Sequence, residues 1–170
     1  MTFCNPEKKL LENVVGIHVE VEFLPFYVNQ PLFHDIDSFL VEKGFTLIDL
    51  NRALFRSANF DRKISSQRQV AWGHALYLKK LDQFNDQSDE AYLKLGVRLL
   101  AICLAFEHFD LALQIVKERR LASLLRGKHG DVARDVAAFA HEYTNNKLSR
   151  IKSRRHIRDA YAWVFRDWKK

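Results

Sequence analysis

The stretch VVGIHVEVEF, residues 14–23, decides the fold because its apolar and polar side chains alternate. Its apolar side comprises Val15, Ile17, Val19, Val21 and Phe23. Its other side includes His18, Glu20 and Glu22. A period of two residues is typical of a β-strand, whose successive side chains point to opposite faces. The sequence therefore predicts a strand over residues 14–23 with one polar side.

The segment after this strand predicts a helix and two more strands. Apolar residues recur at helical spacing over residues 31–43, and Gly44 suits the C-terminal cap of such a helix. We expect strands over residues 45–50, with a continuation toward Phe55, and over residues 70–78. Residues up to about position 80 therefore form an α/β arrangement.

After this α/β part, the hydrophobic period changes to that of a helix. Residues 89–117 predict a helix pair that breaks near Phe109. Asp110 follows this break and is expected to cap the second helix, because a short acidic side chain accepts hydrogen bonds from free N–H groups.

Two further helices are expected near the end, over residues 131–143 and 156–168. The expected breaks are at Gly127, Gly130 and the stretch NNKLS, residues 145–149. The sequence thus predicts an α/β domain over residues 1–80 and a helical extension with a basic C-terminus over residues 81–170.

The composition is that of a globular protein. Hydrophobic residues make up 48% of the 170 residues and charged residues 28%. No apolar run approaches the roughly 20 residues that span a bilayer, and the N-terminus lacks the apolar core of a signal peptide. We therefore expect a cytoplasmic protein. Cys4 and Cys103 have no metal-ligand or disulfide spacing, so no metal site is predicted, and Cys103 is expected in the core.

Positive charge is concentrated at the C-terminus. Residues 147–170 hold nine basic and two acidic side chains, while the rest of the chain is nearly balanced. Such a tail either binds an anionic partner or is a solvated helix face. The polar stretch 57–69 also carries basic residues, and its length is more typical of a functional loop than of a tight hairpin.

Four short sequence elements follow one another along the first 80 residues. They are VEVEF at 19–23, QPLF at 30–33, Gly44-Phe45 and WGHALYL at 72–78. This order resembles the closing section of FkbM-type methyltransferases and covers roughly residues 14–80. The family favours Asp before the ALFL segment, where this sequence has His74, so no carboxylate role is carried over to that position.

The resemblance implies a Rossmann-like sheet. Its last three strands would be a fifth parallel strand, a sixth parallel strand and an antiparallel seventh strand between them. In such folds a glycine-rich turn near the first strands holds S-adenosylmethionine. The sequence has no GxGxG, and only thirteen residues precede Val14, so the donor-binding half is expected to be missing. The chain alone then has no cofactor, and S-adenosylmethionine enters only if the missing N-terminal half is supplied.

Glu20 and Glu22 are the candidate catalytic residues. A parallel strand covered on both faces is normally apolar, so two carboxylates on one side need an explanation. One reading is a base or hydroxyl-binding group for O-methylation of an acceptor such as a sugar hydroxyl. The other is a strand side that faces water or pairs with a neighbouring Arg or His. His18 is expected to be a partly buried partner of such a carboxylate.

The resemblance thus implies a truncated or split S-adenosylmethionine-dependent O-methyltransferase that is inactive alone. The alternative is a non-enzymatic interaction module whose basic helical tail binds an anionic partner such as RNA. The strand over residues 14–23 would lie at an exposed sheet edge, because its usual neighbour is missing. That edge is expected to bind the N-terminal half or a second copy of the chain.

Overall fold

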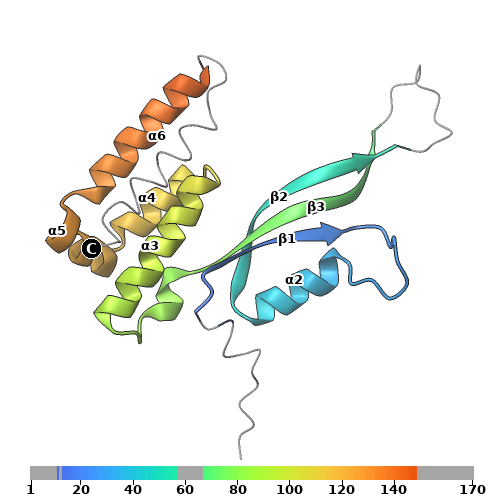
Figure 1. The fold of residues 1–170 in the computed structure, drawn as a ribbon, viewed down its shortest axis with the longest axis horizontal. Coiled ribbons are helices and arrows are strands. Elements are labelled where there is room, and N and C mark those ends of the chain that lie inside the picture. Colours follow the sequence, from blue (N-terminus) through green and yellow to red (C-terminus); the bar gives the residue numbers. More distant parts are fainter. Residues whose placement is uncertain (1–10, 12, 57–66, 149–170) are drawn as a thin grey trace, which may run out of the picture. The chain divides into compact units, whose positions relative to one another are not determined.

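The computed structural model describes residue 11 and residues 13–56 and 67–148 (Figure 1). The chain divides into two compact units, Met1–Lys80 and Leu81–Lys170. The first unit contains a sheet and a helix, and the second unit contains helices. The fold class is therefore mixed α/β.

A three-stranded sheet forms the first unit, in the order β1-β3-β2 (Figure 1). Its strands are β1 (Gly16–Glu22), β2 (Phe45–Phe55) and β3 (Gln69–Lys79). Both outer strands pair antiparallel with β3, so β1 and β2 run in the same direction. The three predicted strands are confirmed, and β2 continues to Phe55 in a single run.

Helix α2 (Phe33–Glu42) connects β1 to β2 and packs on the apolar side of the sheet. Its residue Leu40 lies in a buried cluster to which all three strands contribute apolar side chains. The buried members of this cluster are Val21, Leu40, Phe45, Ala75 and Tyr77. The Tyr77 hydroxyl donates a hydrogen bond of 2.9 Å to the Asp37 carboxylate on α2. Packing and this polar contact together fix α2 on one face.

The ends of α2 follow from local sequence chemistry. The Asp35 carboxylate accepts the N–H of Leu32 at 2.9 Å, which satisfies a free donor at the helix start. Gly44 has a φ of 84°, a left-handed conformation that a residue without Cβ adopts easily. The predicted glycine cap is confirmed, while the helix is shorter than residues 31–43.

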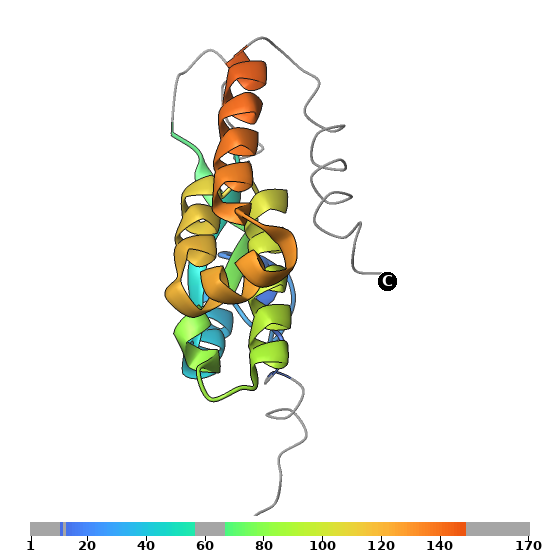
Figure 2. The ribbon, with the colours of Figure 1, turned by 90° about the vertical axis from the view of Figure 1, so that its left-hand side faces the viewer.

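Over residues 81–148, which the structure describes, the second unit packs four α-helices and a short 3-10 helix (Figure 2). The elements are η1 (Leu81–Phe84), α3 (Asp89–Ala105), α4 (Phe109–Lys117), α5 (Arg119–His129) and α6 (Val132–Leu148). The predicted break near Phe109 is confirmed. The expectation that Asp110 caps α4 is wrong, because His108 is the cap residue and its side chain makes no capping hydrogen bond.

Two other expectations for the helical unit are corrected. Helix α5 was not predicted, and it runs through Gly127 rather than breaking there. Helix α6 continues through Asn145 and Asn146 to Leu148, so NNKLS is not a break within the described residues. The expected helix over residues 156–168 lies outside the described residues.

Helix α5 crosses very close to α3. A Cβ atom placed on Gly96 of α3 would lie 2.7 Å from a methyl carbon of Leu121, and the Leu121 side chain is fully buried. Gly96 therefore sets how near the two helices approach. Cys103 on α3 is fully buried, as predicted, and burial raises the pKa of its thiol to about 12.

Arg120 ties the start of α5 to the start of α3. Its guanidinium contacts the Asp89 carboxylate at 2.7 and 3.0 Å and donates to the carbonyls of Asn85 and Gln87 at 2.8 and 2.7 Å. It also lies 4.2 Å from the centre of the Tyr92 ring. One planar cation thus joins a carboxylate, two carbonyls and an aromatic face.

Glu118 caps the N-terminus of α5. Its carboxylate accepts the N–H groups of Arg120 and Leu121 at 3.1 and 2.8 Å and the Tyr92 hydroxyl at 2.9 Å. Burial alone would raise the pKa of Glu118, but these hydrogen bonds and the Arg120 charge together lower it. The ionised carboxylate therefore stabilises the folded helical unit.

Glu118→Gln is expected to lower the free energy of unfolding at pH 7 by about 1 kcal/mol, the usual cost of an impaired helix cap. A carboxyl whose pKa is lowered by folding stabilises the protein above its unfolded pKa of about 4.3 and loses this effect as pH falls through the folded pKa. The difference in free energy of unfolding between wild type and variant should therefore disappear at acidic pH. Urea unfolding followed by far-UV circular dichroism at several pH values tests this, with Glu142→Gln at an exposed position of α6 as control. A gap that stays constant below pH 4 would contradict it.

Candidate functional site on the polar face of the sheet

The candidate residues lie on the face of the sheet opposite α2. In β1, Glu20 is opposite His74 of β3, and Glu22 is opposite Trp72. His18 shares their side of β1 because side chains alternate along a strand. We call the side chains of His18, Glu20, Glu22, Trp72 and His74 the polar face.

Glu20 and His74 form the central pair of this face. Their closest atoms, Oε2 of Glu20 and Nε2 of His74, are 3.9 Å apart. The side chains are 57% and 40% exposed, so water screens the pair. The neighbouring histidine that was expected beside a strand carboxylate is found for Glu20 in His74.

Two aromatic rings flank His74. The His18 ring stacks on it with centroids 5.3 Å apart, and the Trp72 ring meets it edge-on at 5.4 Å. His18 is exposed rather than partly buried, so that part of the expectation is wrong. These contacts restrict the orientation of the His74 imidazole, which gives the face a defined arrangement.

Glu22 lies at the carboxyl end of β1, and the first unit carries several exposed apolar side chains. Trp72 is 39% exposed, and the β2 residues Leu54 and Phe55 are about half exposed. The turn after β1 adds Phe26, Tyr27 and Val28, all of which are exposed. Of these, Trp72 is the one that lies opposite Glu22.

The turn after β1 is held by one side chain. The Gln30 Oε1 atom accepts the N–H groups of Phe26 and Tyr27 at 2.9 and 3.2 Å. Asn29 adopts a φ of 60°, which an Asn tolerates better than most residues. The Phe26-Tyr27-Val28 tip is therefore built as a defined turn, although its apolar side chains contribute little to the core.

By itself, the polar face can bind and orient polar groups. Any further reaction at this face needs a partner. A carboxylate can accept a hydrogen bond from a hydroxyl, or take its proton, only if the acceptor lies within about 3 Å. In water this contact is weak, and a partner that excludes solvent would strengthen it. Among the described residues, no group of three or more His, Cys, Asp or Glu side chains is placed to hold a metal ion.

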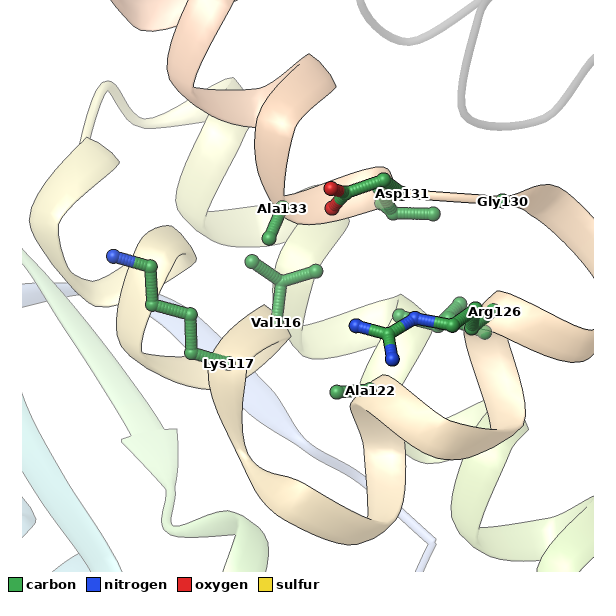
Figure 3. Close-up of a pocket in the computed structure, with 9 residues that line it drawn as sticks. Val116, Lys117, Ala122, Arg126, Gly130, Asp131 and Ala133 are labelled. Atoms are coloured by element: carbon green, nitrogen blue, oxygen red, sulfur yellow. The ribbon is translucent and has the colours of Figure 1, made fainter.

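A small pocket of about 160 Å³ lies in the helical unit, between α4, α5 and the start of α6 (Figure 3). Arg126, Asp131 and Val116 are among the residues that line it. The Lys117 ammonium points away from the Arg126 guanidinium, so the two cations do not converge on one ligand (Figure 3). The Asp131 carboxylate caps α6 by accepting the Arg134 N–H at 3.2 Å. This pocket offers no anion site.

The predicted basic regions fall largely outside the described residues. Residues 149–170 of the tail and residues 57–66 of the loop are not described, and Arg56 and Arg68 on either side of the loop are exposed. In the described part of the chain, no helix is long and apolar enough to cross a membrane.

Sequence reasoning named Glu20 and Glu22 as candidates but did not predict that Trp72 lies opposite Glu22 or that His74 lies close to Glu20. Both depend on the register of β1 against β3, two strands separated by more than forty residues in the chain. A scan against protein-family models found no match, and searches of curated proteins and of solved structures likewise found none. The resemblance to FkbM-type methyltransferases therefore stays a prediction.

Proposed function

We propose that the chain is the acceptor-side part of an S-adenosylmethionine-dependent O-methyltransferase, and that it needs a donor-binding half to act. The observation that carries this proposal is the strand order. β1 and β2 run in the same direction, α2 connects them, and the antiparallel β3 lies between them. This is the order that the resemblance implies for the last three strands of a Rossmann-like methyltransferase sheet.

The described residues do not fit the methyl donor. A donor site of this type needs a glycine-rich turn between a strand and a helix. Within the described ranges, the glycines with positive φ are Gly44 and Gly130, and each lies just after the C-terminal end of a helix. The donor therefore has to be held by residues outside this set.

The polar face supports a role on the acceptor side. In open α/β sheets, ligands bind beyond the carboxyl ends of the parallel strands. Glu22 lies at that end of β1, beside Trp72. Its carboxylate would orient an acceptor hydroxyl and take up its proton, and the exposed indole would pack on the apolar part of the acceptor.

Complementation tests this proposal. The chain is mixed with a polypeptide that carries the first four strands of an FkbM-type methyltransferase and ends before its VEVEF-type strand. S-adenosylmethionine binding by calorimetry and methyl transfer are measured for each part and for the mixture. We expect both only in the mixture. A mixture in which the chain never associates with that half, or never raises its donor affinity, would overturn the proposal.

In an active mixture, Glu22→Gln is expected to lower kcat about 100-fold, the typical effect of losing a general base, with donor affinity unchanged. Glu42→Gln, at the exposed end of α2, is the matched control and should leave kcat unchanged. An unchanged kcat in Glu22→Gln would remove that carboxylate from the reaction but leave the assembly itself intact.

A further inference from the structure

The exposed side of helix α5 carries cations, and the helix contains no acidic residue. Arg119, Ser123 and Arg126 follow one another at steps of four and three residues, so they share one side of the helix, and all three are exposed. The buried residues Leu121 and Leu125 lie on the opposite side. We call Arg119, Ser123 and Arg126 the α5 ridge. Both ends of this ridge are positively charged and face water.

The helix dipole favours only one of these two arginines. Cations are favourable in the last turn of a helix and unfavourable in its first turn. Arg126 lies in the last turn of α5, whereas Arg119 is its first residue. The neighbouring Arg120 is paired with Asp89 at 2.7 Å, but among the described residues Arg119 has no ion-pair partner. An anion supplied by a partner would offset the unfavourable position of Arg119.

The residues on either side of the ridge add charge of the same sign. Lys117 and Lys128 are exposed, and neither forms an ion pair within the part of the chain that the structure describes. The one acidic residue in the sequence 117–130 is Glu118. Its carboxylate already accepts the Tyr92 hydroxyl and backbone N–H groups of α5. The four exposed cations are therefore not neutralised by this stretch itself.

The spacing of the cations suits a polyanion rather than one small anion. Arg119 and Arg126 are two helical turns apart, which is about 10 Å along the axis of α5. The Lys117 ammonium points away from the Arg126 guanidinium (Figure 3). Phosphates on one strand of a nucleic acid duplex repeat about every 3.4 Å along its axis, so separate cations can contact separate phosphates. Between the arginines stands only the small Ser123, which lets a strand approach the helix closely.

We propose that the α5 ridge, together with Lys117 and Lys128, binds the phosphate backbone of a nucleic acid duplex without reading its sequence. This inference goes beyond the proposed function, and it rests on α5 rather than on the basic residues 147–170. Two arginines suit this partner because a planar guanidinium can donate two parallel hydrogen bonds to one phosphate.

The side chains of α5 favour a duplex over the other polyanions. A helix that lies on an anionic membrane inserts bulky apolar side chains from its contact side. In α5 the leucines Leu121 and Leu125 are buried on the opposite side from the ridge. Sequence-independent binding of a single strand uses exposed aromatic rings on which bases stack, and α5 contains no aromatic residue other than His129 at its end. Backbone contacts alone suffice for a duplex.

Arg119→Gln/Arg126→Gln tests the inference in the full chain. Fluorescence anisotropy of a short labelled DNA duplex of mixed sequence gives the binding constant at several salt concentrations. Each lost phosphate contact lowers the slope of log K against log salt by about 0.9, so the variant should lose about 2 in slope and bind at least about tenfold more weakly at low salt. Arg119→Lys/Arg126→Lys keeps both charges and should keep the slope.

Lys94→Gln/Arg98→Gln is the matched control, because it removes the same charge from the same helical unit. Both side chains are exposed on α3. Each lies two residues from Gly96 in the sequence, so both point to the side of α3 opposite the contact of Gly96 with Leu121 of α5. This control variant should keep the wild-type slope.

Three results would overturn the inference. The first is a wild-type chain that does not bind the duplex at low salt. The second is an equal slope for wild type and Arg119→Gln/Arg126→Gln, which would assign any duplex binding to residues outside α5. The third is a variant that loses binding to vesicles of phosphatidylserine and phosphatidylcholine but not to the duplex, which would assign the ridge to a membrane surface. An RNA duplex should show the same loss of slope as DNA, since the contacts are to phosphate.

Discussion

Gly73→Ala is expected to destabilise the sheet unit by about 3 kcal/mol, the upper range for overpacking a filled site. A Cβ atom on Gly73 would lie 2.5 Å from the carbonyl oxygen of Asn51. Carbon–oxygen contacts between neighbouring strands are about 3.3 to 3.6 Å. The obstacle is backbone rather than a side-chain tip, so β2 would have to move away from β3 and lose ladder hydrogen bonds.

Urea unfolding followed by Trp72 fluorescence measures this loss, in a background in which Trp163 and Trp168 are replaced by Phe. Gly127→Ala is the matched control, since a Cβ atom there meets nothing within 4 Å. At this exposed position in the last turn of α5, alanine should stabilise by up to about 1 kcal/mol, because it forms helices better than glycine. A Gly73→Ala variant within about 0.5 kcal/mol of wild type would contradict the close contact.

The second large effect concerns the contact of Gly96 with Leu121, where α3 and α5 cross. Leu121→Ala should cost about 3 kcal/mol, because it empties a fully buried position. Gly96→Ala should cost about 2 kcal/mol, since its new methyl group would lie 2.7 Å from a methyl carbon of the fully buried Leu121 side chain. Both losses of stability arise in the same space between α3 and α5.

The double variant Gly96→Ala/Leu121→Ala should therefore be more stable than the sum of the single losses predicts, by at least about 1 kcal/mol. The added methyl group occupies part of the volume that Leu121 vacates. Far-UV circular dichroism during urea unfolding reports on the helical unit. It gives the free energy of unfolding of the wild type, the two single variants and the double variant, which together form a double-mutant cycle. Additive losses would show that the two side chains do not share the space between α3 and α5.

The strands could be predicted because their signal is local. Alternation marks β1, and a glycine after a helical pattern marks the end of α2 at Gly44, where φ is positive. The order β1-β3-β2 is not local, and it came only from the resemblance. It decides which side chains meet, so the contact of Glu20 with His74 could not be read from spacing.

The helical unit shows where local signals mislead. Gly127 suggested a break, but α5 passes through it because the position is exposed and only Leu121 and Leu125 need burial. Asp110 suggested a cap, but the chain turns at Glu107, which has a φ of 65°, and α4 begins one residue before Asp110. In both places tertiary packing outweighed a sequence preference.

Titration of S-adenosylmethionine into the 170-residue chain alone, followed by calorimetry, tests the central claim most directly. The account predicts no measurable heat of binding and no methyl transfer, with Glu22→Gln indistinguishable from wild type. The physical reason is that methyl transfer needs donor and acceptor held about 3 to 3.5 Å apart in line, and in the proposed assembly this chain supplies only the acceptor side. Micromolar donor binding by this chain would contradict the account and would mean that the donor site lies on these residues.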